Sequence, residues 1–134
     1  MGVKAFADTN VVLYLLSDDA RKAECVEALL PSCLIGVQVL NEIANVARRK
    51  FGMSWTETNR FLYLVRTLCP PCPLTIETHE RARIVAERYG LSFFDALIVA
   101  AALLGRCDTL YSEDMQHGLL IDRQLRICNP FRKE

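Results

Sequence analysis

Short apolar runs alternate with longer helical patterns along this chain, and this alternation constrains its fold more than any other feature. A strand followed by a helix and then by another strand favours parallel pairing, with helices covering both faces of the sheet. The pattern therefore predicts an α/β fold in three layers, α/β/α, with a parallel sheet of about five strands. The strands are expected at residues 3–7, 33–37, 73–76, 108–111 and 125–128.

Helices are expected between these strands, and most of them have a start or a stop signal. Asp18 and Asp19 can cap a helix that Pro31 ends, and Ser54-Trp55-Thr56-Glu57 has the spacing of a capping box. Glycines follow the last two helical patterns and can close them. The helices are expected at residues 9–16, 20–30, 39–51, 54–68, 77–89 and 93–104.

The composition is that of a globular protein. Hydrophobic residues make up 51% of the 134 residues, which excludes a disordered chain. This length suits one domain spanning residues 1–134. No apolar run approaches the roughly 18 residues of a membrane span, so no membrane association is expected. Without a secretory signal, the six cysteines are expected to be free thiols in a reducing cytoplasm.

Two of the cysteines have CxxC spacing, in Cys69-Pro70-Pro71-Cys72. A redox CxxC opens a helix after a strand, whereas this one follows a helical pattern and precedes the strand expected at residues 73–76. A zinc site would need a second pair of ligands, and none has the right spacing. We therefore interpret these cysteines as loop residues.

Four carboxylates lie beside apolar stretches, where burial is costly unless an acid is paired or bound to metal. They are Asp8, Glu42, Asp95 and Asp114. No comparable set of embedded lysines or arginines accompanies them. Two follow expected strands, and two lie in the first turns of helices beside strands. All four can therefore face the crevice at the carboxyl ends of the strands, where such sheets bind ligands.

Each acid also has a purely structural interpretation. Asp8 could cap the helix that follows it, and Glu42 could be a solvated helix position. Asp95 could complete a capping box, and Asp114 could cap the turn at residues 115–118. Taken singly, these interpretations are at least as good as a functional one. Taken together at the strand ends of one sheet, the four acids favour a shared site.

A group of carboxylates suits a hard divalent cation, because Mg²⁺ and Mn²⁺ prefer oxygen ligands. Such an ion polarises a phosphoryl oxygen and lowers the pKa of bound water, which suits phosphodiester hydrolysis. The chain has 16 basic and 16 acidic residues and a formal charge of zero. If metal neutralises four acids, 12 remain against 16 bases, so the rest of the surface attracts anions modestly.

The segments around the four acids resemble the PIN domain family. They are Asp8-Thr9-Asn10, Asn41-Glu42, Phe94-Asp95-Ala96-Leu97-Ile98 and Ser112-Glu113-Asp114. The resemblance extends over residues 5–131 and looks most like the VapC-type toxins of toxin–antitoxin operons. No single segment is specific for the family, but the set of four segments in this order is specific for it.

This resemblance implies an Mg²⁺- or Mn²⁺-dependent endoribonuclease that is the toxin of a type II toxin–antitoxin pair. By the family pattern, the catalytic residues and metal ligands would be Asp8, Glu42, Asp95 and Asp114, supported by Asn10 and Ser112. Glu113 is expected to face solvent. The implied partners are an RNA substrate, a cognate antitoxin and a second copy of the chain in a homodimer.

Two other functions stay open. The chain could be a decayed PIN domain that binds without catalysing, although all four acids are present. It could also be a haloacid-dehalogenase-like phosphatase, which has an Asp after its first strand. That family needs a second Asp where Asn10 stands, and a catalytic lysine, whereas no lysine lies between Lys50 and Lys133.

Some residues outside the acids could contact RNA, but each has a structural interpretation that we prefer. Arg48-Arg49-Lys50 ends a helix, where cations suit the helix dipole, and could instead contact phosphates. Base stacking is one explanation for Trp55, Phe61 and Tyr63. We prefer the explanation that they pack in the core or in a dimer. His79 and His117 lack a partner at metal-ligand spacing.

Overall fold

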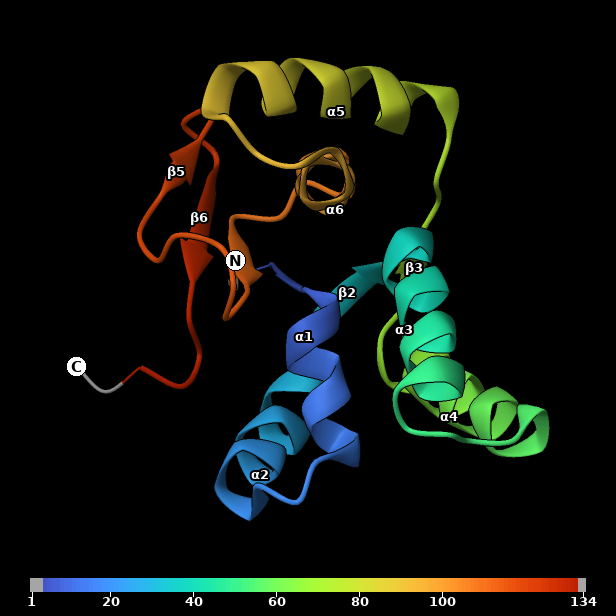
Figure 1. Ribbon diagram of the computed structural model, residues 1–134. Helices are drawn as coiled ribbons and strands as arrows, with labels where there is room; N and C mark the ends of the chain where they lie inside the picture. Colours follow the sequence, from blue (N-terminus) through green and yellow to red (C-terminus); the bar gives the residue numbers. More distant parts are fainter. Residues whose placement is uncertain (1–3, 133–134) are drawn as a thin grey trace.

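The computed structural model describes residues 4–132 and has the expected α/β architecture (Figure 1). Val3, at the start of the first expected strand, lies outside the described residues. Within residues 4–132 the sheet has six strands. They are β1 (Ala5–Ala7), β2 (Cys33–Gly36), β3 (Pro71–Cys72), β4 (Thr109–Tyr111), β5 (Leu120–Ile121) and β6 (Leu125–Cys128).

The helices begin and end close to their sequence signals. Asp19 accepts a hydrogen bond from the Lys22 amide, and Ser54 and Glu57 form both bonds of their capping box. Gly90 closes its helix in the left-handed conformation, at φ 68°. The α-helices are α1 (Thr9–Val12), α2 (Ala20–Leu29), α3 (Val37–Arg49), α4 (Trp55–Leu68), α5 (Ile76–Tyr89) and α6 (Phe93–Leu104). Short 3₁₀ helices, η1 (Leu13–Leu16) and η2 (Leu30–Ser32), follow α1 and α2.

The strand order is β3-β2-β1-β4-β6-β5, and all pairs are parallel except β5 with β6. The chain builds the sheet outward from β1 through β2 to β3, and then returns to place β4 on the other side of β1. This makes the β1–β4 boundary the switch point, where the loops that leave adjacent strands diverge and open a crevice.

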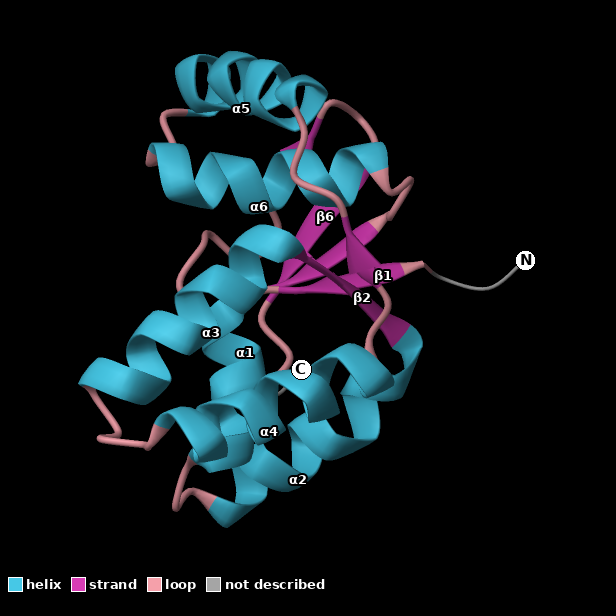
Figure 2. Ribbon diagram, turned by 90° about the vertical axis from the view of Figure 1, so that its right-hand side faces the viewer, coloured by secondary structure: helices cyan, strands magenta, loops and turns pink. Residues whose placement is uncertain are grey.

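Helices cover both faces of the sheet. Figure 2 shows α5 and α6 on one side, and α1, α2 and α4 on the other. Helix α6 is the centre of the core, because the residues from Ala96 to Leu103 are all buried. A helix that is apolar all round needs covering on every side, and here α5, α3 and β2 contact it. This packing fixes the position of the first turn of α6, which carries Asp95.

The third strand differs from the prediction, which placed it at residues 73–76. It is Pro71–Cys72, and Ile76 already belongs to α5. Thr75 and Thr78 form a capping box that starts the helix, although Thr replaces the usual Glu or Gln at the second position. A proline in β3 is tolerated because this strand lies at the edge of the sheet.

The sequence did not predict β5, which makes the far edge of the sheet antiparallel. Asp122, Arg123 and Gln124 connect β5 to β6, and the first two have φ angles of 51° and 57°. Turn positions with positive φ normally use glycine or asparagine, so this turn lacks the usual sequence signal. Tyr89 holds it in place, because its hydroxyl accepts a hydrogen bond from the Asp122 amide at 2.8 Å.

Within the described residues, no helix is both long and apolar enough to cross a membrane. No disulfide links any two cysteines in residues 4–132, as predicted. Cys69 caps the end of α4 and Cys72 lies in β3, and burial raises the pKa of both thiols. A raised pKa is the opposite of what a redox-active CxxC needs, so the structure agrees with a structural role.

Candidate functional site

Asp8 lies at the centre of the candidate site, at the carboxyl end of β1. Its amide donates to the Tyr111 carbonyl at 2.9 Å, which ties the end of β1 to the end of β4. Its carboxylate accepts a bond from the Thr9 amide at 2.7 Å and so caps α1. The capping interpretation of Asp8 is therefore confirmed. It does not exclude a functional role, because the carboxylate has further acceptor positions.

Two side chains hold the second oxygen of the Asp8 carboxylate. The Ser112 hydroxyl donates to Oδ2 at 2.8 Å, and the Asn10 amide donates to the same oxygen at 3.2 Å. Both residues were predicted to support the acids, and the structure places both against Asp8. Asp8 is only 3% exposed, so these bonds fix the orientation of a carboxylate that water barely reaches.

Glu42 comes from the second turn of α3 and is half-buried beside the site. The Thr9 hydroxyl donates to its Oε1 at 2.7 Å, and the Gln38 amide donates to Oε2 at 3.1 Å. Glu42 is thus held at both oxygens and is not a freely solvated helix position. Thr9 contacts both acids, since its amide bonds Asp8 and its hydroxyl bonds Glu42.

Asp95 lies in the first turn of α6, which Ser92 caps by accepting a bond from the Asp95 amide at 3.2 Å. Burial raises the pKa of Asp95, and a hydrogen bond with the Ser92 side chain opposes this rise. The negative charges of Glu42 and Asp114 raise the same pKa further. Asp95 therefore lies within electrostatic reach of two of the other predicted acids.

Asp114 is exposed, and the cap that it was predicted to supply for the following turn comes from another residue. The Ser112 hydroxyl accepts a bond from the Met115 amide at 3.1 Å while it donates to Asp8. Ser112 also donates its own amide to the Cys128 carbonyl at 3.0 Å, which fixes the loop to β6. Asp114 is thus left available on the solvent side of the site.

The four acids form one electrostatically coupled group. The pKa of Asp8 is raised to about 6, mainly by burial and to a smaller extent by the charges of Asp95 and Glu42, while its hydrogen bonds with Ser112 and Thr9 oppose the rise. Asp114 belongs to the same group because its negative charge raises the pKa of Asp95. Each of these charge–charge interactions is repulsive, so the carboxylates destabilise one another unless a cation neutralises them.

Among residues 4–132, no three His, Cys, Asp or Glu side chains are already arranged around one point to hold a metal ion. The donor chemistry nevertheless fits a hard divalent cation, because the converging groups are all carboxylates. A cation between them would turn their mutual repulsion into attraction. The chemistry of the residues present therefore suits Mg²⁺ or Mn²⁺.

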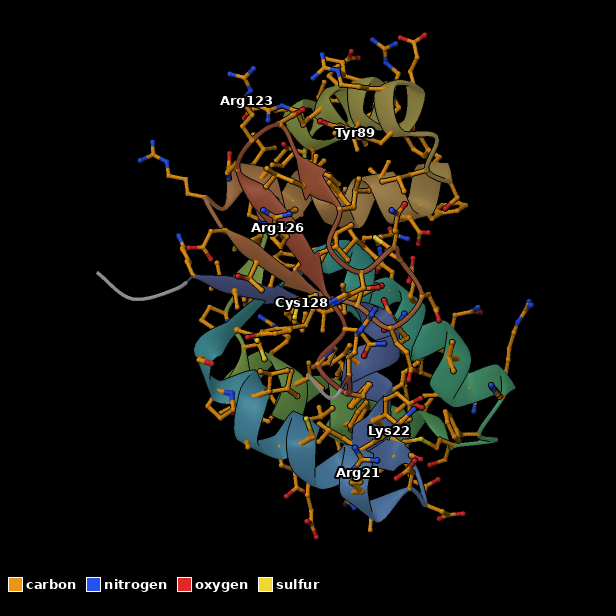
Figure 3. All side chains as sticks on the ribbon, turned by 90° about the vertical axis from the view of Figure 1, so that its left-hand side faces the viewer. Arg21, Lys22, Tyr89, Arg123, Arg126 and Cys128 are labelled. Carbon is orange, nitrogen blue, oxygen red and sulfur yellow. The ribbon has the colours of Figure 1, made fainter. Side chains whose placement is uncertain are left out.

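Glu113 was expected to face solvent, but it is half-buried and paired. Its side chain is 25% exposed, and it accepts a bond from Lys22 at 2.6 Å and another from the Tyr14 hydroxyl. The Lys22 ammonium also lies 4.9 Å from the ring centroids of Tyr14 and Phe131. Figure 3 shows Lys22 on α2, below the end of β6 at Cys128.

This cluster continues to the acids through Asn10. The Glu113 amide donates to the Asn10 side-chain oxygen at 3.2 Å, and the Asn10 nitrogen donates to Asp8. Lys22, Tyr14, Thr9 and Gln38 were not identified from the sequence. The one available signal was helical spacing, which puts Gln38 one turn before Glu42.

A hollow of about 680 Å³ begins beside the site and runs between η1 and the end of α3. Asn10 and Glu113 line the end nearest the acids, and Val46, Lys50 and Phe51 line the far end. The four acids do not line it, so it adjoins the candidate site without containing it.

The histidines contribute little to the site. His79 packs its ring against Phe93 at 5.4 Å between centroids. His117 accepts a bond from the Asn129 amide at 3.0 Å and so helps to hold the C-terminal segment. These contacts agree with the structural interpretation of both residues.

The family model of the PIN domain matches residues 5–118, which include all four acids. Among curated protein sequences, none is detectably similar to this chain.

Several solved structures share the fold. A toxin–antitoxin complex from Klebsiella pneumoniae has a TM-score of 0.74 at 22% identity, covering 97% of this chain and all of its own. VapBC2 from Rickettsia felis, bound to a promoter DNA fragment, has a TM-score of 0.67 at 16% identity, covering 93% and 97%. VapC20 of Mycobacterium tuberculosis, described as a toxin that cleaves the sarcin–ricin loop, has 0.61 at 20%, covering 83% and 90%. At these identities the similarity establishes the fold.

Proposed function

Because the chain belongs to the PIN domain family, whose model spans residues 5–118, we propose that it is a metal-dependent endoribonuclease. We further propose that it is the toxin of a type II toxin–antitoxin pair. Nuclease activity is typical of this family. The observation that carries the proposal is the coupled group of four carboxylates at the β1–β4 switch point.

The residues that would hold the metal are Asp8, Glu42, Asp95 and Asp114. Bound there, Mg²⁺ or Mn²⁺ would polarise the scissile phosphoryl group and lower the pKa of an attacking water. The chain supplies the positioning. Ser112 and Asn10 hold the Asp8 carboxylate, and Thr9 and Gln38 hold both oxygens of Glu42.

The burial of the acids suggests the side from which RNA would approach. Asp8 is 3% exposed and forms the floor, whereas Asp114 is exposed at the rim. A phosphodiester would therefore enter from the side of Asp114 and meet Asp95 and Glu42 above Asp8. Three hydrogen bonds already orient the Asp8 carboxylate at the buried floor, so this part of the site is preorganised.

Cleavage of a mixture of RNAs by the purified chain, with Mn²⁺ or with EDTA, tests the proposal. We expect EDTA, Asp8→Asn and Asp95→Asn each to abolish cleavage. Asp108→Asn is the matched control, because Asp108 is an exposed acid that precedes β4, at the opposite end of the sheet. Cleavage that persists in Asp95→Asn at the wild-type rate would contradict the proposal.

The toxin assignment rests on the structural likeness to toxin–antitoxin complexes. It implies a cognate antitoxin, a homodimer and action on RNA in the cytoplasm. Co-expression of a short open reading frame encoded next to this gene should relieve growth inhibition by the chain and co-purify with it. Size-exclusion chromatography with light scattering should give the mass of a dimer. Growth inhibition that Asp8→Asn leaves intact would argue against a nuclease toxin.

The two alternatives differ in their support. Membership of the PIN family leaves a haloacid-dehalogenase-like phosphatase without support. A decayed PIN domain would keep the fold but would not bind metal at the four acids. Calorimetric titration with Mn²⁺ distinguishes this case, because binding that Asp95→Asn removes supports an intact site.

A further inference from the structure

One face of α3 carries polar side chains from the candidate site to the far end of the helix. Gln38, Glu42, Asn45 and Arg49 follow one another at intervals of three or four residues, so they share a face. Glu42 and Arg49 are seven residues apart, which is roughly 10 Å along a helix. An extended nucleic-acid strand that leaves Glu42 along this face would reach Arg49 within a few nucleotides.

At the end of this face, Arg48 and Trp55 form a stacked pair. The Arg48 guanidinium lies 4.8 Å from the centroid of the Trp55 ring, and its Nη1 donates to the Met53 carbonyl at 2.7 Å. Trp55 is 58% exposed, so the ring remains open to solvent although one contact is made by Arg48. Packing in the core, which was one explanation for this tryptophan, is therefore wrong.

A surface hollow of about 360 Å³ lies beside this pair. It is lined by Ala44, Asn45, Arg48, Arg49 and Trp55. Sites for small ligands have volumes of roughly 300–1,000 Å³, so a single nucleotide fits. An exposed aromatic ring, two guanidinium groups and an amide are the groups that bind an unstacked base and its phosphate.

The surrounding segment is basic although the whole chain has a formal charge of zero. Residues 43–68 contain a single acid, Glu57. They contain five basic residues, Arg48, Arg49, Lys50, Arg60 and Arg66. This segment therefore has a local excess of positive charge, which favours a polyanion as the occupant.

We propose that Asn45, Arg48, Arg49 and Trp55, here called the Trp55 platform, bind single-stranded RNA beside the cleavage point. One base stacks on Trp55, which Arg48 holds in place, and Arg49 contacts a phosphate between that base and Glu42. This inference rests on the proposed function and deepens it, because it assigns a substrate-binding subsite outside the acids.

Trp55 is the only tryptophan of the chain, so its fluorescence reports on this surface alone. The experiment uses the full chain with Asp95→Asn in EDTA, so that RNA is bound without being cleaved. The probe is an end-labelled, single-stranded RNA of mixed sequence, followed by its anisotropy and by Trp55 emission. We expect the RNA to quench Trp55 at the same concentrations at which it becomes bound.

Two substitutions measure the contributions of the platform. Trp55→Ala should weaken binding about 5- to 150-fold, the effect of losing one stacked base. Arg49→Gln should weaken binding and reduce the slope of log K against log salt by about 0.7, the effect of losing one phosphate contact on a single strand. Arg83→Gln is the matched control, since Arg83 is an exposed helical arginine on α5, far from α4 (Figure 1).

Several results would overturn the inference. One is RNA binding with no change in Trp55 emission, and another is equal weakening by Arg49→Gln and Arg83→Gln. A change of Trp55 emission with protein concentration alone, unaffected by RNA, would assign the surface to a contact between copies. If wild-type protein cleaves RNA while any of these results holds, the platform fails and the nuclease proposal stands. If the chain neither binds nor cleaves RNA, both fail.

Discussion

The Lys22 ammonium and the Glu113 carboxylate lie 2.6 Å apart and join two segments that are 91 residues apart in the chain. The same ammonium lies over the rings of Tyr14 and Phe131. Lys22 therefore connects α2, η1 and the C-terminal segment to the loop that carries Ser112 and Asp114. The position of this loop depends on contacts made outside the group of acids.

Replacing Lys22 by methionine should loosen this loop. The methionine keeps most of the apolar stem and removes the charge that Glu113 and the two rings share. We expect the melting temperature to fall by a few degrees and RNA cleavage to fall with it, because Glu113 also holds Asn10 through its amide. Arg21→Met on the same helix is the control (Figure 3). Equal changes in the two variants would show that Lys22 has no special role.

Asp8 should make the metal-free protein less stable at neutral pH than in mild acid. Burial raises its pKa from 3.8 to about 6, so the ionised form is disfavoured in the folded state. The penalty is absent below pH 3.8, grows as the pH rises, and is complete above the folded pKa of about 6. It amounts to on the order of 3 kcal/mol, at ~1.4 kcal/mol per pKa unit.

The variant Asp8→Asn isolates this penalty. In EDTA at pH 7.5, urea denaturation should show a gain of about 1–2 kcal/mol over the wild type, and the gain should vanish near pH 4. The gain is smaller than the full penalty because one amide oxygen cannot accept every bond that the carboxylate accepts. Mn²⁺ should stabilise the wild type and not the variant. A pH-independent difference between the two proteins would refute the assignment.

Thr9→Val should reduce cleavage without removing a metal ligand. Valine has nearly the same shape as threonine, but it cannot donate the 2.7 Å hydrogen bond to Glu42. Loss of such an orienting bond typically costs about 10- to 100-fold in metal affinity or activity. Thr9→Ser keeps the hydroxyl and should retain most of the activity. Steady-state cleavage rates across a Mn²⁺ titration measure the effect, and equal rates for both variants would contradict it.

The three buried cysteines, Cys33, Cys69 and Cys107, should react slowly as thiols. Burial raises the pKa of Cys33 and Cys107 to about 12 and that of Cys69 to about 11. Iodoacetamide at pH 7.5 should therefore leave these three unmodified in the native protein and label all six in urea, as read by mass spectrometry. A reductant should leave the melting temperature unchanged. A lower melting temperature in reductant would instead indicate a disulfide.

Four of the five parallel strands could be located from the sequence, because buried strands leave uninterrupted apolar runs, whereas the short edge strand β3 was placed too late in the chain. The antiparallel edge could not be predicted. The turn at Asp122 is held by residues distant in sequence, with Arg88 paired to its carboxylate at 2.8 Å and Tyr89 bonded to its amide. Contacts of this kind have no local signal, so they appear only once α5 has packed against the sheet.

Some residues of the candidate site could likewise be predicted from the sequence, and others could not. Each acid was recognisable as a carboxylate beside an apolar run, and its neighbours Asn10 and Ser112 lie within a few residues of an acid. Thr9 and Glu42 are 33 residues apart, and their hydrogen bond depends on α1 packing against α3. Glu113 was mistaken for a solvent-facing residue because its partner, Lys22, belongs to a helix that reads as an ordinary surface helix.

The burial of α6 also predicts the order in which parts of the molecule unfold. Its residues from Ala96 to Leu103 are buried without interruption, so their amide hydrogens exchange with deuterium only when the core itself unfolds. In the loop at residues 112–114 only Asp114 is exposed, since Ser112 is buried and Glu113 is paired with Lys22. The candidate site therefore combines an acid at the surface with Asp95, which directly precedes the segment expected to unfold last.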